Sequence, residues 1–195
     1  MDLRNLCVYC GSNPGRQDIY IEAARELGRT MARQGVGLVY GGASIGIMGA
    51  IADAVLEAGG RAVGIIPESL MKKELAHRAL TELHVTQSMH ERKRMMADLA
   101  DGFVALPGGA GTLEEIFEVW TWAQLGHHAK PCALYNAGGY YDRLAQFLDH
   151  MVAEQFVRPQ HRDMLIVEDG PQRLLQRLAD YEAPAVTKWI GRAET

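Results

Sequence analysis

The stretch Gly102–Glu115 reads GFVALPGGAGTLEE: an unbroken apolar run, a glycine-rich turn and the start of a more polar segment. An apolar run without polar alternation is typical of a strand that helices cover on both faces of a parallel sheet. The glycines after it allow the backbone to turn tightly and to approach a ligand closely. The stretch therefore predicts a strand, a ligand-binding turn and a helix in succession, which is the repeating unit of α/β folds.

The same unit recurs along the chain. We expect strands at 5–9, 37–40, 61–66, 83–86, 102–106, 131–135 and 164–167, and helices at 17–34, 46–57, 90–100, 112–125, 141–154 and 171–180, with a shorter helix at 70–74. Regular alternation of this kind predicts an α/β fold with a single doubly wound, Rossmann-like parallel sheet and helices on both faces. Residues 1–182 are expected to form this nucleotide-binding hydrolase domain, and 183–195 a C-terminal tail.

The composition indicates an ordinary soluble protein. The chain has 195 residues, of which 48% are hydrophobic and 23% charged, and a net charge of −4. Such a chain has no overall positive field to attract nucleic acid or an anionic membrane surface, so we expect neither as a partner. No apolar stretch approaches the ~18 residues that a membrane-spanning helix needs. The first residues, MDLRNLCVYCGS, lack the regions of a signal peptide, so the expected location is cytoplasmic.

The cysteines and histidines give little sign of redox or metal chemistry. Cys7 and Cys10 form a C-x-x-C pair, which allows a redox motif. However, Cys7 falls within an apolar run, whereas a reactive pair normally opens a helix, so buried and inert thiols are the favoured interpretation. The histidines are scattered, and the adjacent His127 and His128 would point about 100° apart on a helix. We therefore expect no metal.

The loops that follow the strands should share one edge of the sheet, where ligands bind in open α/β folds. They read CGSNPG, GGASIGIMG, PESLMKKE, QSMHERK, PGGAGTLEE and YNAGGYYD, and glycines crowd four of them. A P-loop requires a Gly-Lys pair, which the chain lacks, and no dinucleotide fingerprint follows the first strand. These absences argue against ATP hydrolysis and hydride transfer and favour a mononucleotide-sized site.

A phosphate is the expected ligand of the turn Gly108-Gly109-Ala110-Gly111-Thr112. Its backbone N–H groups should lie at a helix N-terminus, where they favour an anion, and the Thr112 hydroxyl would add a hydrogen bond. The alternative is that the glycines only permit a tight turn. Three glycines exceed what such a turn needs, which favours the phosphate.

The preceding helix supplies cations near the same edge. Ser88-Met89-His90-Glu91 is a capping box, so the helix should begin near Met89. Arg92 shares a helical face with Met95, Met96 and Leu99, so it should point toward the core and need an anion to pair with. Lys93 and Arg94 can equally be solvated surface residues, and for Arg94 this is the favoured interpretation.

Two glutamates complete the turn. Thr112-Leu113-Glu114-Glu115 also matches a capping box, and on local grounds capping and catalysis are equally good explanations of Glu115. A carboxylate one turn beyond a phosphate is suited to the oxocarbenium-like sugar centre that forms when a nucleotide's N-glycosidic bond breaks, and it can direct water. Glu114 should face solvent.

The motifs P-G-G-x-G-T-x-x-E (107–115) and M-H-x-R-K (89–93) resemble the LONELY GUY family of cytokinin-activating phosphoribohydrolases, and the likeness extends over about residues 5–155. The resemblance implies hydrolysis of N6-modified adenosine 5′-monophosphate to the free base and ribose 5-phosphate by a homodimer, without a metal or organic cofactor. It implies that Arg92 and Glu115 are the catalytic pair. The substrate contacts that it implies are Glu74, Arg92, Lys93, Gly108, Gly109, Ala110, Gly111, Thr112, Leu113, Glu114, Glu115 and Thr121.

Some alternatives stay open. Ala110 stands where the family often has Tyr, so the choice between AMP and its N6-prenylated forms is open. A molybdenum-cofactor carrier without turnover would share the phosphate site but would not need Glu115. A phosphoribosyltransferase would show an acidic pair before its phosphate loop, which GFVALPGG lacks. Many members are labelled lysine decarboxylases, but no lysine here has a recognisable setting for a pyridoxal phosphate Schiff base.

The predicted helix at 112–125 suggests a second surface. It carries Ile116, Phe117, Val119, Trp120 and Trp122, so it is apolar on more than one side and needs cover beyond its own sheet. A homodimer would provide this cover. Burial within one subunit beneath the C-terminal segment is the alternative.

Overall fold

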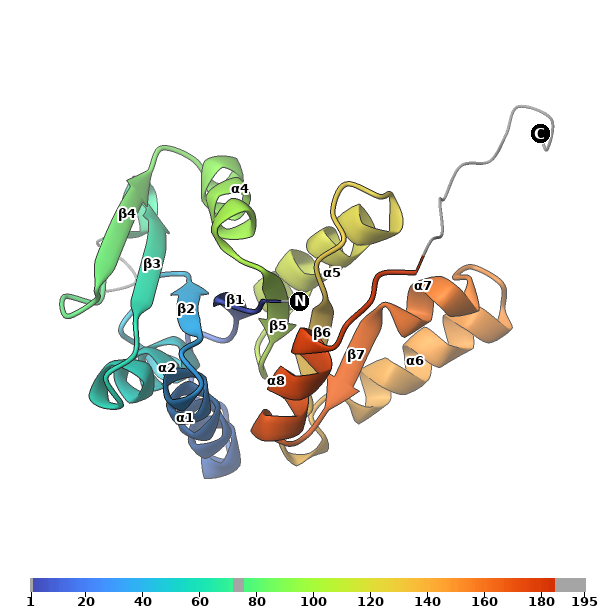
Figure 1. Ribbon diagram of the computed structural model, residues 1–195, viewed down its shortest axis with the longest axis horizontal. Coiled ribbons are helices and arrows are strands. Elements are labelled where there is room, and N and C mark those ends of the chain that lie inside the picture. Colours follow the sequence, from blue (N-terminus) through green and yellow to red (C-terminus); the bar gives the residue numbers. More distant parts are fainter. Residues whose placement is uncertain (1, 72–75, 185–195) are drawn as a thin grey trace.

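The computed structural model describes residues 2–71 and 76–184. Seven parallel strands form one sheet in the order β4-β3-β2-β1-β5-β6-β7 (Figure 1). In chain order they are β1 (Asn5–Tyr9), β2 (Gly37–Tyr40), β3 (Ala62–Pro67), β4 (Glu82–Thr86), β5 (Gly102–Ala105), β6 (Cys132–Tyr135) and β7 (Leu165–Glu168). All seven strands that the sequence predicts are therefore present. The doubly wound, Rossmann-like fold is confirmed.

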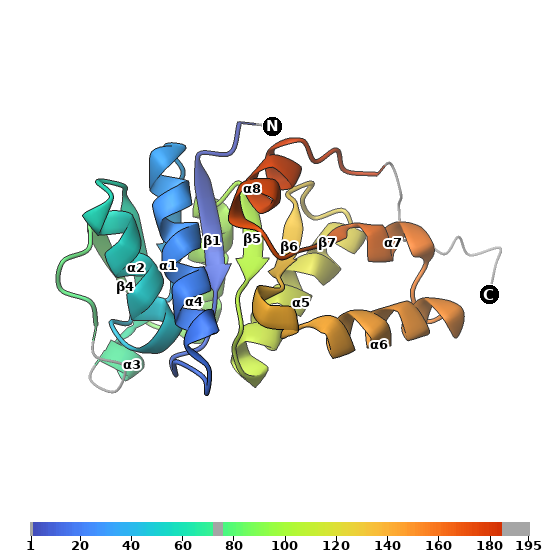
Figure 2. The same ribbon diagram turned by 90° about the horizontal axis from the view of Figure 1, so that it is seen from below.

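Helices cover both faces of the sheet. One face carries α1 (Asp18–Arg33), α2 (Gly46–Glu57) and α8 (Pro171–Ala179), and the opposite face carries α4 (Met89–Leu99) and α5 (Ala110–Gln124), as Figures 1 and 2 show. The helices α6 (Asp142–Ala153) and α7 (Pro159–Asp163) lie at the β7 end of the sheet. Two short segments, α3 (Glu68–Met71) and the 3-10 turn η1 (Ala137–Gly139), follow β3 and β6.

The alternation of side chains along β1 divides the core in two. Leu6 and Val8 point to one face, where they pack with buried residues of α1, α2 and α8 such as Leu27. Cys7 and Tyr9 point to the other face and pack beneath α4 and α5. Both faces of the central strand are thus fully buried, which is why its sequence reads as a continuous apolar run.

The strand order reverses at β1, and this position determines where a ligand can bind. The chain places β2 to β4 on one side of β1 and β5 to β7 on the other, so the loops after β1 and β5 diverge and leave a crevice between them. One backbone bond joins these two loops, from Gly11 N–H to the Pro107 carbonyl at 3.1 Å. A second joins the loop after β1 to the start of α2, from Ile47 N–H to the Gly11 carbonyl at 3.1 Å.

Several helix boundaries differ from those predicted. The helix α5 begins at Ala110, two residues before the predicted start, and the short helix after β3 begins at Glu68, also two residues before its predicted start. Neither η1 nor α7 was predicted, because elements of three and five residues are too short to show a helical period. Glu74 and most of the expected tail, 185–195, lie outside the described residues. Within the described residues, no helix is long and apolar enough to cross a membrane.

Candidate active site

A cavity of about 440 Å³ opens at the carboxyl edge of the sheet, between the loops that follow β1 and β5. Its walls come from the β1–α1 loop, the first turn of α2, the N-terminal halves of α4 and α5, and the segment after η1. Of the residues predicted to bind substrate, it is lined by Arg92, Gly108, Gly109, Gly111, Thr112, Glu114 and Glu115. The crevice is thus where the topology places it, and it contains the predicted catalytic pair.

Three carbonyl groups of the glycine-rich loop accept hydrogen bonds from within the protein. The Pro107 carbonyl accepts from Gly11 N–H at 3.1 Å, and the Gly109 carbonyl accepts from Leu113 N–H at 3.3 Å. The Gly108 carbonyl accepts from the Tyr140 hydroxyl at 2.6 Å. In contrast, the N–H groups of 109–112 donate to no acceptor within the described part of the chain. Free N–H groups at the start of a fifteen-residue helix are suited to an anion, which is compatible with the predicted phosphate.

The capping-box interpretation of Thr112 and Glu115 is wrong. Gly109 is the N-cap of α5, with an extended backbone and no side-chain cap, so Thr112 lies within the first turn and Glu115 lies beyond it. Thr112 is buried, and its hydroxyl packs against the Cα of Gly108, where a Cβ would overlap it. The local, structural explanation of Glu115 therefore falls away.

The helix α4 begins as predicted and turns Arg92 inward. Ser88 caps it by accepting from Glu91 N–H at 3.1 Å, and the Glu91 carboxylate accepts from Gln87 N–H at 2.8 Å. One turn later, Arg92 is buried, as the apolar face of α4 predicts. Gly41, directly after β2, makes room for it, because a Cβ there would overlap Nη2 of the guanidinium.

Arg92 and Glu115 meet at the floor of the crevice. Nη2 of Arg92 lies 3.7 Å from Oε1 of Glu115, and the two side chains are only 6% and 15% exposed. Nη1 of Arg92 contacts the Met89 sulfur at 3.7 Å, and its Nε has no hydrogen-bond partner among the residues described. A buried guanidinium with spare donors is suited to a further anion, because charge interactions are strong where water is scarce.

The end of β1 lies close to this pair. Burial raises the pKa of the Cys10 thiol, and the negative charge of Glu115 raises it further. Burial likewise raises the pKa of Cys7 and Cys132. All three thiols are buried and form no disulfide, so the predicted burial of Cys7 and Cys10 is confirmed, and the raised pKa values favour unreactive thiols.

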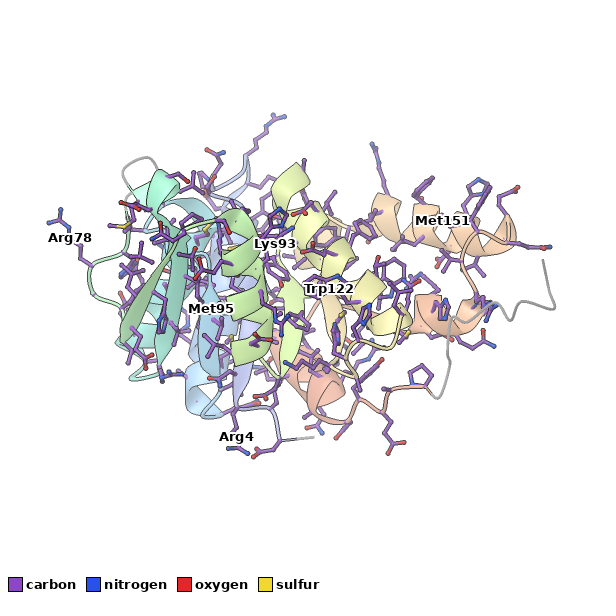
Figure 3. All side chains as sticks on the ribbon, turned by 90° about the horizontal axis from the view of Figure 1, so that it is seen from above. Arg4, Arg78, Lys93, Met95, Trp122 and Met151 are labelled. Atoms are coloured by element: carbon purple, nitrogen blue, oxygen red, sulfur yellow. The ribbon has the colours of Figure 1, made fainter. Side chains whose placement is uncertain are left out.

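Lys93 is turned toward α5 and away from the cavity lining (Figure 3). Its Nζ donates to Glu114 at 2.7 Å and to Glu118 at 3.0 Å, and the residue is only 8% exposed. Burial alone would lower the pKa of Lys93, but the bonds to the two carboxylates outweigh it, and the pKa is raised. The solvated-surface interpretation of Lys93 is therefore wrong. Glu114, expected to face solvent, is 58% exposed but is bound to Lys93.

The remaining predicted positions lie around the site. Arg94 is 76% exposed and pairs with Asp98, which confirms its surface interpretation. Ala110 and Thr121 are exposed on α5 and Leu113 is half-buried, and none of these three lines the described cavity. Glu74 lies outside the described residues.

Several lining residues were missed by sequence reasoning. Tyr140, Tyr20, Met48 and Met89 all line the cavity. Tyr140 belongs to YNAGGYYD and Met48 to GGASIGIMG, two loops that were expected at the ligand edge on their glycines alone. Attention to the aromatic and apolar residues within those loops would have found them, since nucleotide sites need apolar as well as polar walls.

Comparison with known proteins agrees with this geometry. A family model described as "Possible lysine decarboxylase" matches residues 48–178. A probable cytokinin riboside 5′-monophosphate phosphoribohydrolase of Oryza sativa subsp. japonica is 48% identical over 91% of this chain and 78% of its own length. A cytokinin riboside 5′-monophosphate phosphoribohydrolase of Rhodococcoides fascians is 50% identical over 84% of this chain and 83% of its own.

The chain belongs to this phosphoribohydrolase family. The fold of the family extends further: the molybdenum cofactor binding protein of Rippkaea orientalis has a TM-score of 0.69 over 92% of this chain and 97% of its own. At 20% sequence identity, that likeness shows a common fold alone.

The decarboxylase description of the family model finds no support in the site. The two lysines within the described ranges are both engaged elsewhere: Lys93 binds carboxylates, and Nζ of Lys130 donates to the Ala97 carbonyl at 2.7 Å. Neither lines the cavity, so neither is placed to form a Schiff base there.

Proposed function

We propose that this protein hydrolyses the N-glycosidic bond of adenosine 5′-monophosphate or an N6-modified form of it, releasing the free base and ribose 5-phosphate. The observation that carries the proposal is the buried Arg92–Glu115 pair, 3.7 Å apart, next to a loop whose N–H groups are unpaired within the described residues. A loop suited to an anion and a carboxylate that line the same cavity match the two ends of a ribose 5-phosphate group. The curated relatives named above carry the same activity in their names.

The phosphate would be bound by the N–H groups of 109–112 and by the Thr112 hydroxyl. Its negative charge would be further balanced by Arg92, whose guanidinium has donors to spare. Binding at one end of the nucleotide then positions the sugar against Glu115, so that the energy of the phosphate contact orients the reacting carbon.

In the chemical step, the bond from the anomeric carbon to N9 breaks, and its electron pair leaves with the purine. Glu115 stabilises the positive charge that develops on the ribosyl group. A water molecule adds its oxygen to the anomeric carbon and loses a proton to Glu115. The departing base takes up one proton from solvent, and Glu115 releases its proton to solvent, so that the net change is the addition of one water molecule. The positive charge of Arg92 lies 3.7 Å from Glu115 and attracts its carboxylate, which keeps the side chain at the floor of the cavity. Water is the nucleophile and the protein supplies the charges, so the proposed reaction needs neither a metal nor an organic cofactor.

Product analysis tests the proposal. Incubation with AMP and with N6-isopentenyl-AMP, followed by chromatography, should yield the free bases and ribose 5-phosphate. Release of adenosine and inorganic phosphate would identify a phosphatase instead. Nucleotide binding without any product would favour a carrier. The ratio of kcat/KM for the two substrates, measured for the native chain and for Ala110→Tyr, would decide the base preference.

We also propose a homodimer. On α5, Phe117 and Trp122 are half-buried, and Leu99 and Leu125 are exposed near the ends of α4 and α5. Figure 3 looks onto the face of the sheet that α4 and α5 cover, and Met95 and Trp122 lie on this face. Trp120, in contrast, is covered within the chain, since its Nε1 donates to the His161 carbonyl at 3.0 Å. Light scattering at micromolar concentration should give twice the mass of the 21.5 kDa chain, and the mass of one chain would refute the dimer.

A further inference from the structure

Tyr140 lies directly after η1 and extends over the phosphate loop. Its hydroxyl donates to the Gly108 carbonyl at 2.6 Å, and its ring lines the cavity while remaining 42% exposed. The ring is held edge-on by Tyr20, at 5.5 Å between centroids, and by Tyr141, at 4.9 Å. Aromatic contacts on two sides keep the hydroxyl aimed at Gly108.

The bond from Tyr140 is the only hydrogen bond to the Gly108–Gly109 peptide among the described residues. Neither Gly108 nor Gly109 has a side chain that would limit rotation of the peptide between them. At Gly109 an added Cβ would meet no atom within 4 Å, so packing restrains this end of the peptide less than the Gly108 end, which lies against Thr112. The peptides on either side are fixed by backbone bonds: the Pro107 carbonyl by Gly11 N–H, and the Gly109 carbonyl by Leu113 N–H.

The direction of one end of a peptide fixes the other. A peptide is planar and trans, so its C=O and N–H groups point in opposite directions. When the Tyr140 hydroxyl holds the Gly108 carbonyl, it therefore also sets the direction of the Gly109 N–H, the first of the unpaired donors of the loop. If this peptide rotated, a carbonyl oxygen would replace that donor and repel an anion.

We propose that Tyr140 is a positioning residue of the anion site: its hydroxyl keeps the Gly108–Gly109 peptide in the orientation that presents the Gly109 N–H to the 5′-phosphate of the substrate. This inference rests on the proposed function for the identity of the anion. It assigns part of the phosphate affinity to a residue that need not touch the phosphate. Because the peptide is already oriented before binding, the nucleotide does not have to bear the cost of ordering it.

Tyr140→Phe tests the proposal, because it keeps the ring and removes only the hydroxyl. The contact to the phosphate is the same in the ground state and the transition state, so the KM for AMP should rise about tenfold while kcat stays within about twofold. The dissociation constants for AMP and for ribose 5-phosphate, measured by calorimetry, should rise by a similar factor. The melting temperature should change by less than about 2 °C.

Tyr141→Phe is the matched control. Its hydroxyl donates to the Leu106 carbonyl at 2.6 Å, and it is fully buried before α6, outside the cavity lining. Its loss leaves a buried acceptor unpaired, so this variant should melt at a lower temperature with an unchanged KM.

Two outcomes would overturn the proposal: an unchanged KM and AMP affinity in Tyr140→Phe, or a lowered melting temperature with kcat and KM both impaired, which a merely structural role would produce. The calorimetric titrations do not depend on turnover. If the protein bound AMP but did not hydrolyse it, the proposed function would fail while the role of Tyr140 was still tested.

Discussion

Substitution of Gly41 tests the position of Arg92 without changing a charged residue. Gly41 has no left-handed backbone conformation, so its backbone accepts alanine without strain. The added Cβ would overlap Nη2 of Arg92 and lie 3.3 Å from the Met48 sulfur. The guanidinium must then retreat by about 1 Å to restore van der Waals contact. Nη2 is also the atom that faces Glu115, so the substitution displaces one member of the proposed catalytic pair.

The cost should fall on activity and not on the fold. The clashing atom is the end of a long, flexible side chain, so the free energy of unfolding should change by less than about 1 kcal/mol. A misplacement of about 1 Å in a reacting group can lower the rate about 10²-fold, which corresponds to ~2.7 kcal/mol in the barrier. We therefore expect kcat/KM for AMP to fall about 10²-fold in Gly41→Ala, by chromatographic rate assay, at a nearly unchanged melting temperature.

Two controls make the result decisive. Gly170→Ala, at the N-cap of α8, would place a Cβ no closer than 3.7 Å to Arg173 and should leave kcat/KM unchanged. In an Arg92→Ala background the clash is gone, so Gly41→Ala should then have little further effect. Wild-type activity in Gly41→Ala, or the same fold loss with and without Arg92, would refute the reasoning.

The remaining predictions concern charge and pH. Glu115→Gln should lower kcat about 10²-fold while AMP binds at least as tightly by calorimetry, because one negative charge next to the phosphate is removed; wild-type kcat would exclude the carboxylate from the chemistry. Lys93→Met breaks the bonds between α4 and α5 and should lower the free energy of unfolding in urea by about 1–3 kcal/mol. Arg94→Ala removes only a surface ion pair and should lower it by less than ~1 kcal/mol. Equal effects would contradict a stabilising role for the buried bonds of Lys93. Burial, with Lys130 and His127 nearby, lowers the pKa of His128, although its bond to the Val119 carbonyl opposes the shift. The folded state therefore favours neutral His128. This contribution to the free energy of unfolding is complete above the ordinary histidine pKa of about 6.5, and it is lost as the pH falls through the lower pKa of the folded state. His128→Gln should thus flatten the fall in melting temperature between about pH 7 and pH 5, and an unchanged slope would contradict this.

Local features of the sequence were sufficient for the strands, the glycine loops and the start of α4. The runs LCVY and GFVAL are apolar throughout because both faces of their strands are buried, and Ser88 caps α4 through a bond to a residue three positions away. The inward direction of Arg92 also followed from helical spacing alone. Each of these properties depends on neighbours within one or two turns of the chain, so the sequence contains them directly.

The composition of the site was decided by the tertiary structure. Arg92 and Glu115 meet because β5 pairs with β1, which brings α4 and α5 side by side over the same face of the sheet. The same packing allows Lys93 to donate a hydrogen bond to Glu118, 25 positions away, and the Tyr140 hydroxyl to donate one to the Gly108 carbonyl, 32 positions away. A hydrogen bond depends on positions to a few tenths of an ångström, and between residues so far apart in the chain only the packing of the whole sheet fixes them.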